Sequence, residues 1–271
     1  MFAVSHFAQA AESRWAKFEG SKVHFLETGS KKNKDAIVFI HGWMCNADFW
    51  SDSMNAFPNQ RVIAVDLIGH GRSDKPRIAY TIDLLARSVA AVLKEADVDR
   101  AVLIGHSMGT PVARQVYRIH PKKVRGLVIV DGGLRAYFTK DEGAQFLSAF
   151  RKDYKASTTE FVNGMLKPIN DQILKKKIGD AMLSGPDYVG ISAMEGLGEE
   201  RLWKADAIDV PVLAIYDDSG GWPADNESFL RTLTPQLDYQ SWKGVSHFLM
   251  MERPSEFNGQ LKMFMIKNKI L

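Results

Sequence analysis

Short apolar runs recur along the chain, each followed by a glycine-rich or polar turn and then by a helical period. Such runs are typical of strands that are buried on both faces of a parallel sheet. We expect strands at residues 23–27, 36–40, 61–65, 101–104, 124–130, 210–216 and 237–242. Apolar positions at helical spacing predict helices over residues 81–96 and 108–120. The pattern therefore predicts an α/β fold, with a mostly parallel central sheet that is flanked by helices.

The alternation of strand and helix breaks between residues 133 and 206. Four helical segments without a convincing buried strand occupy this stretch, at residues 144–150, 159–166, 173–182 and 188–196. In parallel sheets the ligand site gathers at the carboxyl ends of the strands. We therefore interpret residues 133–206 as a helical cap over that edge, and residues 1–132 and 207–271 as the core. Ordinary crossover helices are the alternative interpretation.

Composition narrows the function classes. The 271 residues include 35 Lys and Arg against 32 Asp and Glu, and a net charge of +3 argues for neither nucleic acid nor an anionic membrane as partner. A single cysteine, Cys45, excludes an internal disulfide, and no apolar run reaches the roughly 18 residues of a membrane span. We expect a cytoplasmic protein, with export possible if residues 2–11 are the remnant of a signal peptide. The oligomeric state is left open.

The clearest chemical signal is the pentapeptide Gly105-His106-Ser107-Met108-Gly109, which matches Gly-x-Ser-x-Gly. It lies between a predicted strand and a predicted helix, as a nucleophile elbow requires. Glycines are needed where a Cβ atom would collide with neighbouring backbone, and the turn projects the serine hydroxyl above the sheet. Ser107 is therefore the predicted nucleophile, and Cys45 is the weaker alternative.

A serine needs a base to take its proton. Of the seven histidines, His247 is best placed, because it lies near the C-terminus, after the last predicted strand. The oxyanion formed during acyl transfer needs two backbone N–H donors. We expect them from Met108, which follows the nucleophile, and from Trp43, in the turn after residues 36–40. No cofactor is predicted, because the chain has neither a P-loop, nor a dinucleotide fingerprint, nor a His-Glu-x-x-His metal motif.

Together, His41-Gly42, the loop at residues 66–73, the elbow and the stretch at residues 244–248 resemble the α/β-hydrolase superfamily. More narrowly, they resemble its capped esterase, lactonase and C–C hydrolase branch. The resemblance covers the chain from about residue 22 onward. It implies the α/β-hydrolase fold and a triad of serine, acid and histidine, and it implies a structural rather than a catalytic loop at residues 66–73.

The acid is where the sequence departs from that pattern. Family members carry Asp or Glu a few residues beyond the strand corresponding to residues 210–216, commonly after a glycine. Here Asp217 replaces the glycine, and the usual acid position falls near Gly220. We favour Asp218 as the acid. Asp131, at the end of the strand at residues 124–130, is the main alternative, and Asp217 and Asp225 remain open.

Apolar side chains around these positions predict a cleft for an acyl or aromatic group. The candidates are Met44, Leu134, Tyr137, Phe138 and Trp222. The predicted function is a carboxylic-ester hydrolase of the serine esterase type, acting on small to medium apolar substrates through an acyl-enzyme. The predicted partner is thus a small ester-like molecule. A lactonase or C–C bond hydrolase with the same triad is an alternative, and a slow-turnover ligand sensor is an alternative of another class.

Overall fold

An eight-stranded sheet forms the centre of the protein, in a computed structural model that describes residues 10–136, 138–219 and 221–270. The strands lie in the order β1-β2-β4-β3-β5-β6-β7-β8. β1 pairs antiparallel with β2, and β2 with β4, whereas the other neighbours are parallel. Their bounds are β1 Glu12–Phe18, β2 Ser21–Thr28, β3 Asp35–Ile40, β4 Val62–Val65, β5 Arg100–His106, β6 Val124–Val130, β7 Val212–Asp217 and β8 Leu237–Trp242.

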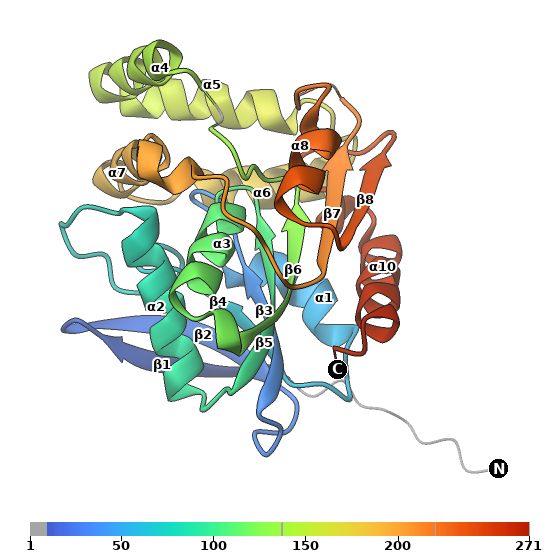
Figure 1. Ribbon diagram of the computed structural model, residues 1–271. Coiled ribbons are helices and arrows are strands. Elements are labelled where there is room, and N and C mark those ends of the chain that lie inside the picture. The colour runs from blue at the N-terminus through green and yellow to red at the C-terminus, as the bar shows by residue number, and fades with distance from the viewer. Residues whose placement is uncertain (1–9, 137, 220, 271) are drawn as a thin grey trace.

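Helices cover both faces of the sheet (Figure 1). α2 and α3 pack against each other on one face, and α1 and α10 on the other. No helix of the described residues is long and apolar enough to cross a membrane. The α-helices of this core are α1 Ser51–Asn55, α2 Ile82–Glu95, α3 Gly109–Ile119, α8 Asn226–Leu233, α9 Leu249–Glu252 and α10 Pro254–Lys267. Two 3₁₀ turns accompany them, η1 Ala47–Trp50 and η2 Pro121–Lys123.

The apolar runs of the sequence form the middle of the sheet. Five of the six residues of β3 are buried, and so are all four residues of β4. The predicted α/β fold with a mostly parallel sheet is confirmed. β1 was not predicted, because it is an edge strand in which only Ala16 and Phe18 are buried, and it lacks a continuous apolar run.

Four α-helices follow β6 before the chain returns to β7, one at each of the helical segments expected from the sequence. They are α4 Lys140–Lys152, α5 Tyr154–Leu166, α6 Gln172–Leu183 and α7 Asp187–Leu197, and the 3₁₀ turn η3 Glu200–Trp203 follows them. α4, α5 and α7 lie beyond the arrowheads of the parallel strands (Figure 1). These helices therefore stand over the edge of the sheet where a ligand site is expected.

Candidate active site

The turn between β5 and α3 places Ser107 at the carboxyl edge of the sheet. Ser107 has a φ of +52°, a backbone conformation that residues other than glycine rarely adopt. A Cβ atom at Gly105 would lie 2.3 Å from the Gly109 carbonyl oxygen, and one at Gly109 would lie 2.3 Å from the Ile40 carbonyl oxygen. Both glycines are thus required by close backbone approach, and the tight turn keeps the Ser107 side chain partly exposed.

His247 is held by a buried carboxylate. Its Nδ1 lies 2.5 Å from Oδ2 of Asp131, the residue directly after β6. Asp131 is only 2% exposed, and its Oδ1 accepts hydrogen bonds from the Trp222 indole at 2.7 Å and from the Asp217 amide at 3.1 Å. Both carboxylate oxygens therefore have partners, and Asp131 is fixed in a position that orients the imidazole.

The structure does not bring Asp218, the acid favoured from the sequence, to His247. The Asp218 amide donates to the Trp242 carbonyl at 3.0 Å and so prolongs the pairing of β7 with β8. This directs the exposed Asp218 carboxylate to Ser241, whose Oγ lies 3.4 Å away. The acid beside His247 is the alternative, Asp131.

The two remaining acids have other partners. The Asp217 carboxylate accepts hydrogen bonds from the amide and the hydroxyl of Ser219, at 3.0 and 2.6 Å. Asp225 forms an ion pair with Arg135 at 2.6 Å, and this interaction lowers the pKa of the Asp225 carboxyl.

A cavity of about 1580 Å³ joins these groups, because Ser107, Asp131 and His247 all line it. Its wall is largely apolar, and most of it comes from the segment between β6 and β7, from both helices and loops. Large apolar side chains on this wall include Phe146, Phe161, Met165 and Met194. The cavity is thus largely apolar. Ser107, Asp131 and His247 lie on its wall at the carboxyl edge of the sheet, and the segment between β6 and β7 adds the glutamates Glu160, Glu195, Glu199 and Glu200.

The predicted pocket residues divide into three groups. Phe138 and Trp222 line the cavity, and Tyr137 lies outside the described residues. Met44 and Leu134 are buried in the core and do not line it. For Met44 the reason is its backbone: φ is +55°, and its Cε lies 2.1 Å from where a Cβ atom at Gly185 would be. The Met44 side chain therefore packs beneath the end of α6.

The predicted oxyanion donors, Trp43 and Met108, both line the cavity. Met108 directly precedes α3, and the first amides of a helix have no partner within it. A Cβ atom at Gly42 would lie 3.0 Å from the Ser107 Cβ, so the turn after β3 passes close to the nucleophile. The Trp43 indole donates to the Gly190 carbonyl at 2.8 Å and ties this turn to α7.

His106 is a neighbour of the site that sequence reasoning missed. Its Nε2 donates to the His247 carbonyl at 2.8 Å, and the two imidazole rings lie 4.7 Å apart. Burial, together with the nearby His247, holds the pKa of His106 well below its ordinary value, so its ring is neutral. His106 therefore anchors the backbone of His247. No local sequence pattern predicts this role, because the two residues lie far apart in the sequence.

Cys45, the alternative nucleophile, is unsuited to that role. It is 2% exposed, and burial raises the pKa of its thiol. A thiol attacks as the thiolate, so a buried, protonated cysteine is inert.

The chain is similar in sequence to a protein family and to known proteins. The family described as "alpha/beta hydrolase fold" matches residues 35–167. A non-heme chloroperoxidase of Streptomyces lividans is 40% identical over 269 residues, which cover 91% of this chain and 96% of that protein.

Two solved structures are similar along most of the chain. The structure described as Est816, an N-acyl homoserine lactone degrading enzyme, has a TM-score of 0.78 and 28% identity, and covers 93% of this chain and 100% of its own. The enol-lactonase of Burkholderia xenovorans LB400 has a TM-score of 0.83 at 20% identity, with coverage of 93% and 100%. At that identity the second likeness shows the fold alone.

Proposed function

The chain belongs to the alpha/beta hydrolase fold family, and we propose that it is a serine hydrolase that cleaves carboxylic esters through an acyl-enzyme on Ser107. A hydrolase role follows from the family. The observation that carries the ester chemistry is the bond between His247 and Asp131 at the edge of a cavity that Ser107 also lines. A nucleophile, a base and an oriented acid are the parts that acyl transfer needs.

In the proposed mechanism the Ser107 hydroxyl attacks the ester carbonyl while His247 takes its proton. Asp131 stabilises the resulting imidazolium and keeps the ring oriented. The oxyanion is stabilised by the amides of Met108 and Trp43. The alcohol leaves with the proton from His247. A water molecule, deprotonated by His247, then attacks the acyl-enzyme and releases the acid.

We further propose that helices α4–α7 act as a cap that selects the substrate. Ligand pockets commonly measure roughly 300–1000 Å³, and the cavity of about 1580 Å³ exceeds that range. Its wall contains Phe146, Phe161 and Met165, all from the helices of the cap. These features favour an ester or lactone with a bulky apolar or aromatic group over a very small ester.

The test is hydrolysis of p-nitrophenyl esters from acetate to decanoate by wild type and matched variants. Ser107→Ala should abolish turnover, and Asp131→Asn should lower kcat on the order of 10³-fold or more, because the acid no longer orients a charged imidazole. Asp218→Asn is the matched control, since it makes the same change on an exposed carboxylate, and should leave kcat unchanged. Full activity of Ser107→Ala would contradict the proposal. Negligible turnover by folded wild type, even with lactones and diketones, would favour a ligand sensor instead.

The relative from Streptomyces lividans supports a second candidate function, perhydrolysis. If hydrogen peroxide replaces water in the second step, the acyl-enzyme releases a peroxyacid, which can oxidise halide without a metal or haem. The assay is bromination of monochlorodimedone with acetate, bromide and hydrogen peroxide. Bromination that needs both acetate and Ser107 would support this activity, and bromination by Ser107→Ala would refute it.

A further inference from the structure

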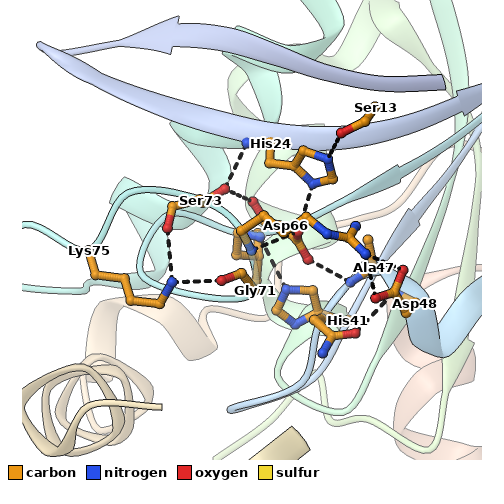
Figure 2. Close-up of polar contacts among 12 residues, drawn as sticks. Ser13, His24, His41, Ala47, Asp48, Asp66, Gly71, Ser73 and Lys75 are labelled. Carbon is orange, nitrogen blue, oxygen red and sulfur yellow. Dashed lines mark hydrogen bonds and ion pairs between the residues drawn. The ribbon is translucent and has the colours of Figure 1, made fainter. Parts of the chain in front are cut away.

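A second arrangement of serine, histidine and aspartate lies outside the cavity, between β1, β2 and the loop after β4 (Figure 2). Ser13 Oγ lies 2.6 Å from Nε2 of His24, and His24 Nδ1 lies 2.7 Å from Oδ2 of Asp66. We propose that Ser13 is a second reactive serine, which forms covalent adducts with small acyl and phosphoryl electrophiles. This site is independent of the function proposed for Ser107.

The hydrogen-bond order matches that of an activated nucleophile. Asp66 is 1% exposed, and its Oδ1 accepts from the Ala47 amide at 2.7 Å, while Oδ2 accepts from the Arg72 amide at 3.0 Å. Burial alone would raise the pKa of Asp66, but the bonds from His24 and these amides outweigh it and lower the pKa. Asp66 is thus a carboxylate. In a neutral His24, the Nδ1 proton donated to Asp66 leaves Nε2 as the acceptor for the Ser13 hydroxyl, which lies 2.6 Å away.

The three side chains differ in exposure in the way that a reactive site requires. His24 is fully buried, whereas Ser13 is exposed at the edge of the sheet. Trp15 lies two residues along the same strand, 47% exposed, and its ring packs edge-on against His24 at 4.9 Å. Ser13 therefore meets solvent on one side and a shielded base on the other, beside an aromatic surface that suits an aryl ester.

The loop does not need Ser13 in order to hold its shape. Ser73, which is buried, donates to the Asp66 carbonyl at 2.6 Å and accepts from the His24 amide at 2.8 Å. These bonds already connect β2 to the loop, as Figure 2 shows. The hydroxyl of Ser73 is occupied by backbone partners, whereas Ser13 is exposed and its hydroxyl oxygen lies 2.6 Å from an imidazole nitrogen.

In the proposed step, Ser13 Oγ bonds to the carbonyl carbon or the phosphorus, and its proton passes to His24 Nε2. The leaving group departs with the bonding electron pair and takes that proton. The imidazolium formed in between is stabilised by Asp66, its buried counter-ion. Ser13 does not line the cavity, so we expect electrophiles to react with it directly from solution, without first binding in a pocket. This favours small electrophiles.

The experiment labels full-length Ser107→Ala protein with diisopropyl fluorophosphate, which leaves a stable adduct on reactive serines, and follows each serine by peptide mass spectrometry. Ser184 is the matched internal reference, because it is exposed and donates to the Ala181 carbonyl at 2.8 Å rather than to a base. Base catalysis contributes on the order of 10²–10⁴-fold. We expect Ser13 to be labelled about 100-fold faster than Ser184. In His24→Gln, the labelling rate of Ser13 should fall to that of Ser184.

Equal rates at Ser13 and Ser184 in the Ser107→Ala protein would overturn the proposal, whether or not any His24 variant folds. Fast labelling of Ser13 that persists in a His24→Gln protein with native circular dichroism would overturn it as well, because the base would then have no role. Fast labelling that is lost with His24 supports it.

Discussion

The hydrogen bond from Trp222 to Asp131 gives a quantitative test of how the acid is held. Trp222→Phe keeps an aromatic ring on the cavity wall and removes the indole donor, which lies 2.7 Å from Asp131 Oδ1. The buried Asp131 retains the Asp217 amide on that oxygen, at 3.1 Å. A hydrogen bond to a charged group contributes about 1.5–3 kcal/mol. Because the amide remains, we take the lower end, about 1.5 kcal/mol, which corresponds to roughly a tenfold loss of kcat.

The assay is the steady-state hydrolysis of one p-nitrophenyl ester at a fixed pH. We expect kcat to fall about tenfold and KM to change less than threefold, because the wall keeps its ring. Trp242→Phe is the control, since it removes another indole hydrogen bond, to Gln240 at 3.1 Å, away from the cavity lining. A wild-type kcat in both Trp222→Phe and Trp242→Phe would show that the Trp222 indole does not position Asp131.

Three further predictions concern the fold around the site. Gly109→Ala places a Cβ atom 2.3 Å from the carbonyl oxygen of Ile40 in β3 and should lower both Tm and kcat. Gly259→Ala, in open space within α10, should instead raise the free energy of unfolding by about 0.5–1 kcal/mol. Thermal melts in which the two variants shift Tm in the same direction would contradict this. Burial lowers the pKa of His70 to about 3, so the unfolded chain binds a proton below about pH 6.5 that the folded protein does not. Stability should therefore fall with decreasing pH by up to about 1.4 kcal/mol per pH unit from this group, and urea titrations of His70→Asn between about pH 4 and 6 should show a shallower slope. Trp43→Phe removes the hydrogen bond from the indole to the Gly190 carbonyl. Because such a bond contributes about 1 kcal/mol, hydrogen exchange of the α7 amides should become about fivefold faster. Unchanged exchange would show that the bond does not restrain the helix.

The strands of the central sheet and the nucleophile turn could be predicted because their determinants are local. β3 and β4 are buried on both faces, so an apolar run alone identifies them. The turn at Ser107 needs a glycine two residues before and two residues after the serine, and this spacing is visible in the sequence itself. The resemblance to the family rested on the same local signals.

The acid could not be predicted because several aspartates end neighbouring strands. Asp131 follows β6, Asp217 is the last residue of β7, the next strand of the sheet, and Asp218 follows it. Which carboxylate faces His247 depends on how far β7 continues its pairing with β8, and that is a property of the assembled sheet. The prediction that Met44 lines the pocket was wrong for a related reason, because its backbone has a positive φ and its side chain packs against Gly185 instead of lining the cavity.

The arrangement around Ser13 was beyond the reach of local patterns as well. It joins β1, whose exposed pattern predicts no strand, to His24 on β2 and to Asp66 after β4. Only the antiparallel pairing of β1 with β2 brings the serine to the imidazole.

Identification of the covalent intermediate tests directly whether Ser107 is the nucleophile. Wild type and Ser107→Ala are mixed with a p-nitrophenyl ester, quenched in acid within the first turnover, and digested for peptide mass spectrometry. We expect a transient acyl group on Ser107 that forms at the rate of the p-nitrophenol burst and is absent from Ser107→Ala. Rapid hydrolysis by wild type with no acyl group on Ser107 at any time would contradict it.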